Sequence, residues 1–74
     1  MELEVKLFAS LQRFNQQQER FELKDGATVL DFLERFGIPA SEVAIVLVNG
    51  RHAELEQPLR EGESIAVFPP IAGG

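Results

Sequence analysis

Residues 28–37 have the sequence TVLDFLERFG, and this stretch predicts the clearest helix of the chain. Thr28 can cap its start, with Asp31 three residues later as the acidic partner in a capping box. Gly37 suits the position that follows a helix, and Pro39 prevents continuation. Apolar residues spaced three and four apart give the helix one apolar side: Val29, Phe32, Leu33 and Phe36. A helix of this length is not stable alone, and we therefore expect it to pack on a sheet.

Two strand patterns precede this helix. Residues 2–8 alternate, with Leu3, Val5 and Leu7 on one face, which predicts a half-buried strand. Residues 9–18 lose the alternation and end in a run of Asn and Gln, so we predict a solvated loop there. Residues 19–23 alternate again and predict a second strand, with Phe21 and Leu23 facing inward, before the turn at Asp25-Gly26.

Three further strands follow the helix. The run 43–48 is continuously apolar, which is typical of a strand covered on both faces or exposing apolar surface on one. Asn49-Gly50 favours a hairpin, with a short returning strand at about 51–54. Residues 63–68 predict the last strand, with Ile65 and Val67 facing the core, and Pro69-Pro70 ends it.

The predicted fold is therefore α+β: one main helix packed on a mixed sheet of four to five strands. With 74 residues there is room for one domain, spanning 1–74, with a flexible C-terminal tail at 69–74. The chain has no cysteine and a single histidine, so disulfides and metals are not expected to stabilise it. An apolar core must do so, and 45% hydrophobic residues can supply one.

Charge and hydropathy exclude some partners. The net charge of −5 argues against nucleic acid and favours a basic protein surface, although acidity also serves solubility alone. No apolar run approaches the roughly 18 residues needed to span a membrane, and the first residues do not resemble a secretory signal. We expect a cytoplasmic protein with no membrane partner.

The sequence ends in Gly73-Gly74, directly after the apolar stretch VFPPIA. A terminal carboxylate is ionised at neutral pH and is a poor electrophile until another enzyme activates it. Two residues without side chains can pass through a narrow active site. Fully extended, the tail 69–74 reaches about 20 Å from the sheet, and Pro69-Pro70 stiffens its base.

An apolar docking surface is expected beside this tail. Phe68 follows the inward-facing Val67, so it points to the opposite face of the sheet together with Ala66. The run 43–48 must add either Ile45 and Leu47 or Val46 and Val48 to that face. Such a patch would bind a partner, unless a loop such as 9–14 covers part of it.

No set of residues predicts catalysis by the chain alone. His52 is interpreted as a solvated strand residue, because no cluster of ligands surrounds it in the sequence. The acidic residues form no recognisable acid/base pair, and we interpret them as solvated faces: Glu54, Glu56, Glu61 and Glu63. No nucleophilic thiol or phosphate-binding loop is present.

The chain resembles the MoaD/ThiS family of sulfur carriers, which have the ubiquitin-like β-grasp fold. The specific part of the resemblance is the tail, VFPPIAGG at 67–74. Weaker matches are the opening VKLFA at 5–9, the GATV segment at 26–29, and Val48-Asn49-Gly50. Pro58-Leu59 and Gly62 before the last strand also fit.

The resemblance implies both a topology and a chemistry. The first and last strands would pair in parallel at the middle of the sheet. Gly74 would be adenylated and converted to a thiocarboxylate, and Gly73 would allow access to the activating enzyme. The residues implied to bind partners are Phe68, Pro69, Pro70, Ile71 and Ala72; no cofactor or metal would be bound.

The implied partners are a MoeB/ThiF-type adenylating enzyme, which uses ATP, and the large subunit of molybdopterin synthase or thiazole synthase. The Phe68-Pro69-Pro70 junction favours the molybdopterin branch, which serves molybdenum or tungsten cofactor, and the chain would then be the small subunit or co-substrate of the synthase. A carrier for the thiamine thiazole, tRNA thiolation or sulfur amino-acid synthesis is an alternative. A ubiquitin-like modifier that is attached to lysines, or a plain interaction module, are others.

Overall fold

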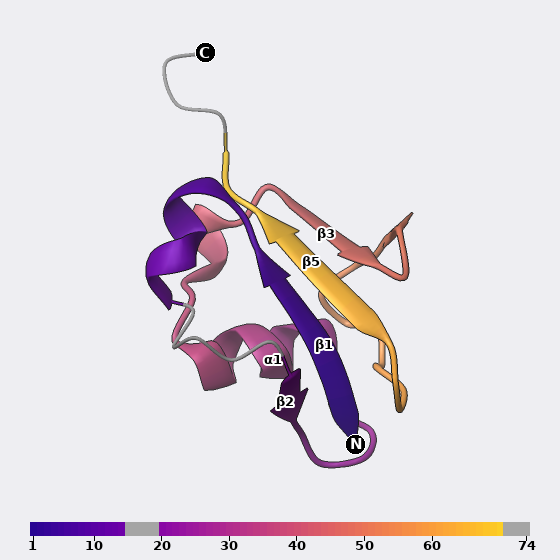
Figure 1. Cartoon of the computed structure of the whole chain (residues 1–74). Coiled ribbons are helices and arrows are strands. Elements are labelled where there is room, and N and C mark those ends of the chain that lie inside the picture. The colour runs from indigo at the N-terminus through magenta and orange to yellow at the C-terminus, as the bar shows by residue number, and fades with distance from the viewer. Residues whose placement is uncertain (15–19, 71–74) are drawn as a thin grey trace.

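The structure, a computed structural model, describes residues 1–14 and 20–70 (Figure 1). The elements follow one another in the predicted order of two strands, a helix and three strands. Two short 3-10 helices are added, η1 before β2 and η2 before β3. The bounds are β1 Glu2–Leu7, η1 Ala9–Phe14, β2 Arg20–Glu22, α1 Val29–Phe36, η2 Ala40–Glu42, β3 Ile45–Val48, β4 Arg51–His52 and β5 Ser64–Phe68.

The strands form one mixed sheet in the order β2-β1-β5-β3-β4. The central pair, β1 and β5, is parallel, with Val5 opposite Ile65 and Leu7 opposite Val67. The other pairs, β1–β2, β3–β5 and β3–β4, are antiparallel. The expected parallel pairing of the first and last strands is therefore confirmed, and the fold is a β-grasp.

Helix α1 begins and ends where its sequence predicts. The Thr28 hydroxyl accepts a hydrogen bond from the Asp31 N–H at 3.2 Å, and the Asp31 carboxylate accepts one from the Thr28 N–H at 2.9 Å. That backbone N–H lowers the pKa of the Asp31 carboxyl below its usual value, against a smaller opposing effect of desolvation. At the other end, Gly37 has a φ of 75°, the left-handed conformation that glycine adopts without strain.

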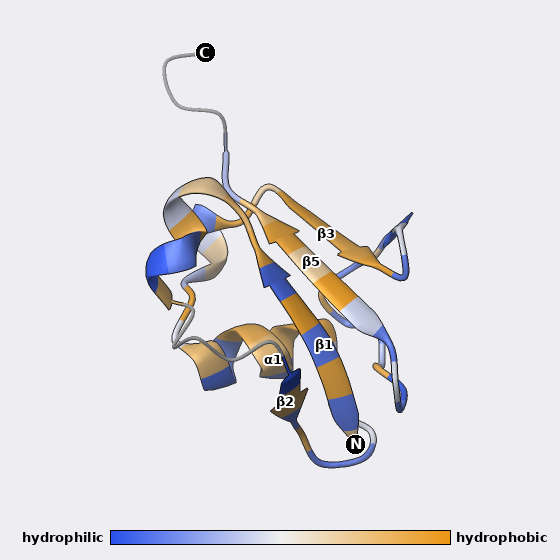
Figure 2. Ribbon diagram, in the orientation of Figure 1, coloured by the Kyte–Doolittle hydropathy of each residue, from blue (hydrophilic) through white to orange (hydrophobic). Residues whose placement is uncertain are grey.

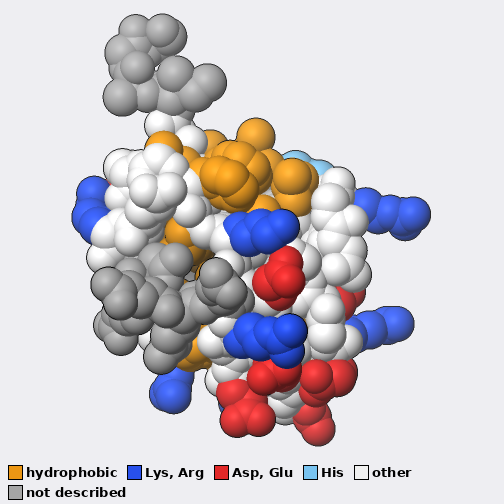
Figure 3. All heavy atoms as spheres, viewed as in Figure 1, with side chains coloured by type: hydrophobic (Ala, Val, Ile, Leu, Met, Phe, Trp, Pro, Cys, Tyr) orange, Lys and Arg blue, Asp and Glu red, His pale blue; other side chains and the backbone are white. Residues whose placement is uncertain are grey.

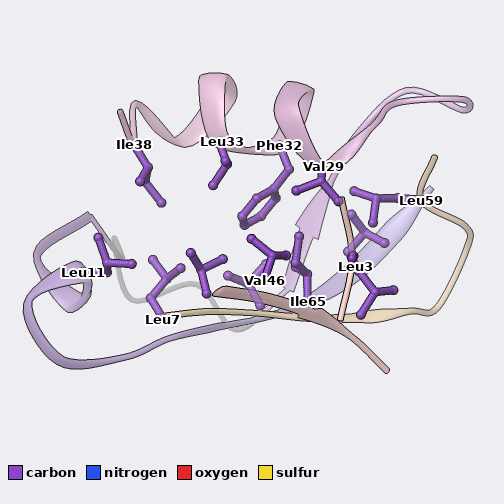
Figure 4. Packing of buried hydrophobic residues seen from close by; sticks show 14 residues of the cluster. Leu3, Leu7, Leu11, Val29, Phe32, Leu33, Ile38, Val46, Leu59 and Ile65 are labelled. Atoms are coloured by element: carbon purple, nitrogen blue, oxygen red, sulfur yellow. The ribbon is translucent and has the colours of Figure 1, made fainter. Parts of the chain in front are cut away.

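The core lies between α1 and one face of the sheet. Figure 4 shows helix side chains pointing toward those of the strands, with Leu11 and Leu59 at the two ends of this layer. Phe32 and Phe36 of the helix also pack against Phe21 of β2. The buried cluster comprises Leu3, Val5, Leu7, Leu11, Val29, Phe32, Leu33, Ile38, Val46, Val48, Ala53, Leu59, Ile65 and Val67.

The solvated loop predicted for residues 9–18 is wrong in its first part. Ala9–Phe14 forms η1, and Leu11 within it is fully buried. Leu11 and the partly buried Phe14 lie three residues apart, but two apolar residues in so short a segment are too few to predict a 3-10 helix in place of a loop. Residues 15–18 of the predicted loop lie outside the described residues.

Several predicted strands are shorter in the structure. The apolar run 43–48 contributes only Ile45–Val48 to the sheet, and the returning strand stops at His52 instead of Glu54. The second strand is Arg20–Glu22, although the Leu23 N–H continues the pairing by donating to the Met1 carbonyl at 2.9 Å. Single inter-strand hydrogen bonds continue past the other two ends as well, from the Ala44 N–H to the Phe68 carbonyl and from the Ala53 N–H to the Val46 carbonyl.

Replacing Thr28 with alanine is predicted to lower the free energy of unfolding by about 1 kcal/mol, because the Asp31 N–H loses its cap. Denaturant unfolding followed by circular dichroism measures this difference. Thr28→Ser keeps the hydroxyl and should stay close to the wild type. Equal stability of Thr28→Ala and the wild type would show that the cap contributes nothing.

Leu11→Ala is predicted to lower the free energy of unfolding by about 2–5 kcal/mol, since it leaves a cavity at the end of the core. The neighbouring Gln12 is exposed, so Gln12→Ala should change stability by less than about 0.5 kcal/mol. Thermal unfolding of both variants makes the comparison. A Leu11→Ala variant as stable as Gln12→Ala would contradict the buried position of Leu11.

Candidate functional site

The sheet has one face away from the helix, which we call the open face. Val46 and Val48 are buried in the core with Ile65 and Val67, so the alternating residues of β3 and β5 face the other way. The register confirms this, because Ile45 lies opposite Phe68 and Leu47 opposite Ala66. Of the two pairs that the sequence left open, Ile45 and Leu47 therefore lie on the open face.

A group of apolar side chains gathers at one end of this face. Ile45 and Phe8 have exposed fractions of 44% and 37%, although both are large and apolar. In Figure 2 the upper parts of β3 and β5 are hydrophobic, and Figure 3 shows hydrophobic side chains close together where β5 ends. We call this group the tail-side patch; its members are Phe8, Ile45, Leu47, Ala66 and Phe68.

The segment Ala9–Phe14 was considered as a possible cover for the apolar patch, but its buried residue Leu11 faces the core. Leu11 turns into the core beside Leu7, so η1 closes the end of the core (Figure 4). Phe68 is partly covered instead by Phe8, whose ring is stacked on it. Among the described residues the patch thus keeps its exposed members.

Charged side chains of β1 and β2 border the patch on this face, with Lys6 directly opposite the patch residue Ala66 and Glu4 opposite Ser64. Glu4 and Lys6 of β1 lie 3.5 Å apart, and Arg20 of β2 lies 3.1 Å from Glu2. All four side chains are at least half exposed, so such pairs contribute about 0–1 kcal/mol each. A partner bound across this face would meet apolar side chains near the tail, Lys6 beside them, and further charges of both signs along β1 and β2, which can set its register.

The segment Phe68–Pro70, which we call the tail root, connects β5 to the tail. The Phe68 carbonyl accepts a hydrogen bond from the Ala44 N–H at 2.8 Å, and the Val67 carbonyl accepts one from the Phe8 N–H at 3.2 Å. Pro69 is half-buried and Pro70 is exposed. The predicted residues Phe68, Pro69 and Pro70 thus lie at the patch end of the sheet, whereas Ile71, Ala72, Gly73 and Gly74 lie outside the described residues.

Among residues 1–14 and 20–70, the other ionisable side chains are not gathered into a metal-binding cluster. His52 is exposed at the edge of the sheet, opposite Leu47. Within residues 1–14 and 20–70, no group of three or more His, Cys, Asp or Glu side chains is placed to hold a metal. No helix in the described part of the chain is long and apolar enough to cross a bilayer.

Sequence reasoning missed Phe8 as a member of the site. The alternation of residues 2–8 shows only that Phe8 leaves the inward face, while its contact with Phe68 follows from the parallel pairing of β1 and β5. A signal was present, since an aromatic residue follows the first strand and another ends the last one.

Comparison with known proteins identifies the family. The sequence profile of the ThiS family matches residues 5–74. No curated protein sequence matches the chain.

Several solved structures are similar over the whole chain. SAMP1 from Haloferax volcanii is 32% identical with a TM-score of 0.74, and the match covers 100% of both chains. A putative molybdopterin converting factor subunit 1 from Pyrococcus furiosus is 26% identical with a TM-score of 0.77, covering 96% of this chain and 99% of that one. Subunit 1 in a complex of molybdopterin-converting factor subunits 1 and 2 from Helicobacter pylori covers 100% of both chains at 22% identity and a TM-score of 0.59, which shows the fold alone.

These matches support a sulfur carrier of the ThiS/MoaD type or a modifier similar to SAMP1. The parallel central strands and the single capped helix agree with this family's β-grasp fold. The chain belongs to the ThiS family.

Proposed function

We propose that the chain is a sulfur carrier whose reactive group is the carboxylate of Gly74. A partner adenylating enzyme of the MoeB/ThiF type joins this carboxylate to the AMP part of ATP and releases pyrophosphate. Sulfide displaces AMP and leaves a thiocarboxylate on Gly74. With a persulfide donor the displacement gives an acyl disulfide instead, and a thiol of the partner then cleaves its S–S bond, which releases the thiocarboxylate and forms a disulfide on the partner. The chain supplies the carboxylate and the docking surface, while the partner supplies ATP binding and catalysis.

The observation that carries this proposal is the position of the tail root. The central strand β5 leads into Phe68-Pro69-Pro70 directly beside the tail-side patch, so a partner that binds the patch is close to the start of the tail. The match to the ThiS family extends to Gly74, so it includes both glycines. No metal-binding cluster in the described part of the chain offers a competing site.

Within this class we propose the molybdopterin branch, in which the thiocarboxylate donates sulfur to molybdenum or tungsten cofactor and the second partner is the large subunit of molybdopterin synthase. The similarity to the putative molybdopterin converting factor subunit 1 of Pyrococcus furiosus supports this choice. A ThiS-like carrier for the thiamine thiazole, with thiazole synthase as partner, is the alternative within the same chemistry.

A second candidate function is protein modification. Its support is the 32% identity to SAMP1, a name that stands for small archaeal modifier protein 1. In this case the adenylated Gly74 is transferred to a lysine amine and forms an isopeptide bond. The two functions share activation and differ only in the nucleophile that accepts the acyl group.

Incubation with an adenylating enzyme, ATP and sulfide is predicted to replace one oxygen of the chain by sulfur. Intact-mass spectrometry of the full chain measures this change, and a chain lacking Gly74 is the control that should keep its mass. Lysine-linked conjugates would instead identify a modifier. An unchanged mass of the full chain with several adenylating enzymes would contradict both functions and indicate an interaction module.

Ile45→Glu is predicted to raise the KM of the carrier for its adenylating enzyme by about tenfold or more, because it places an unpaired charge in the tail-side patch. Steady-state pyrophosphate release at varied carrier concentration measures the KM. Leu30 on α1 is a matched control, since it is 38% exposed and lies outside the patch. If Leu30→Glu and Ile45→Glu have the same KM, the patch is not the docking surface.

A further inference from the structure

Phe8 is a large aromatic residue that the core does not use. The aromatic cluster of the core is formed by Phe32 and Phe36 of α1 and Phe21 of β2. Phe8, in contrast, lies beyond the end of β1, and 37% of its surface is exposed. Its ring is parallel to that of Phe68, with the centroids 4.4 Å apart and 5° between the planes. Phe8 therefore packs on the residue from which the tail departs.

The backbone holds Phe8 from several directions. Its N–H donates to the Val67 carbonyl at 3.2 Å, and its carbonyl accepts the Leu11 N–H at 3.1 Å. Ala9 has a φ of 52°, a left-handed conformation that a residue with a Cβ rarely adopts. Since Leu11 is fully buried, the turn through Ala9 is fixed to the core. The backbone of Phe8 is thus held in place, which sets the direction from which its side chain reaches Phe68.

Phe68 is the last residue of β5, and its surroundings control how the chain continues. Its carbonyl is bound by the Ala44 N–H on the side of β3, and its ring is bound by Phe8 on the side of β1. Pro69 and Pro70 have no N–H to donate, so they cannot extend the ladder. Because proline fixes its own φ and restricts the backbone of the residue before it, few torsions remain free at the tail root, and the ψ angle of Phe68 is one of them.

We infer that Phe8 is a positioning residue for the reaction at the tail. By stacking on Phe68 it holds the tail root in one direction, so that a partner bound to the tail-side patch receives the tail correctly placed. This inference rests on the proposed function, activation of Gly74. It differs from a simple docking role for Phe8, because positioning affects the rate within the complex more than the affinity.

Three variants separate the two roles. Phe8→Leu keeps an apolar side chain but removes the planar ring, whereas Phe8→Tyr keeps the ring. Leu30→Ala is the matched control, since Leu30 has nearly the same exposed fraction on another element. Pyrophosphate release by an adenylating enzyme with ATP gives kcat and KM for each variant.

We expect Phe8→Leu to lower kcat about two- to tenfold, the range that corresponds to the loss of one aromatic stack. The KM of Phe8→Leu should change by less than about twofold. Phe8→Tyr should keep the wild-type kcat, and Leu30→Ala should have the kcat and KM of the wild type. A raised KM at unchanged kcat would overturn the inference and make Phe8 a contact residue only. Wild-type kinetics for Phe8→Leu would also overturn it, while the proposed function would stand.

A second measurement needs no enzyme. The χ1 rotamer of Phe68, determined by NMR couplings in the protein alone, should be single in the wild type and in Phe8→Tyr and averaged in Phe8→Leu. A single Phe68 rotamer in all three proteins would overturn the inference, whatever the kinetics. If no adenylating enzyme activates the wild type, the proposed function fails and the positioning role fails with it.

Discussion

The parallel pairing of β1 with β5 sets the topology of the sheet and the place where the tail begins. It joins residues about sixty positions apart, such as Val5 and Ile65, and makes the two end strands the centre of the sheet. Because parallel strands end on the same side, the residue after β1 and the last residue of β5 meet. Phe8 and Phe68 stack for this reason, and the tail starts beside an exposed apolar surface.

The position of α1 determines which face of the sheet is available to a partner. Helix α1 covers the face that carries Val46, Val48 and Val67, and a β-grasp with one helix leaves the other face to solvent. Exposing apolar residues on that face costs free energy, and a group of such residues is typical of a binding surface. Their position at the tail end, with charged pairs along β1 and β2, supports docking of a partner that also receives the tail.

Much of the fold was predictable because local signals agree with it. The capping box at Thr28 and Asp31 and the turn at Asn49-Gly50 depend only on neighbouring residues, and both are present. The continuously apolar run 43–48 has no period, so the sequence could not assign its faces; the pairing of β3 with β5 does so. η1 was missed because only Leu11 and the partly buried Phe14 face the core, and two apolar residues are too few to establish a repeat.

The candidate site was predictable only in part, because some of its residues are brought together by strands far apart in the sequence. The importance of Phe68 and the prolines follows from the end of a strand pattern, whereas the part played by Phe8 requires the long-range register of two strands. Nonlocal pairing is not encoded in any one segment, so a sequence without a known fold cannot place these residues together.

We propose that an activating enzyme binds the open face of the sheet at the tail end. The most direct test is NMR mapping of the isotope-labelled chain upon titration with an adenylating enzyme. We expect shifts or broadening at the amides of the tail-side patch, Phe8, Ile45, Leu47, Ala66 and Phe68, with those of α1 little changed. Perturbation centred on α1, with the patch unaffected, would contradict it.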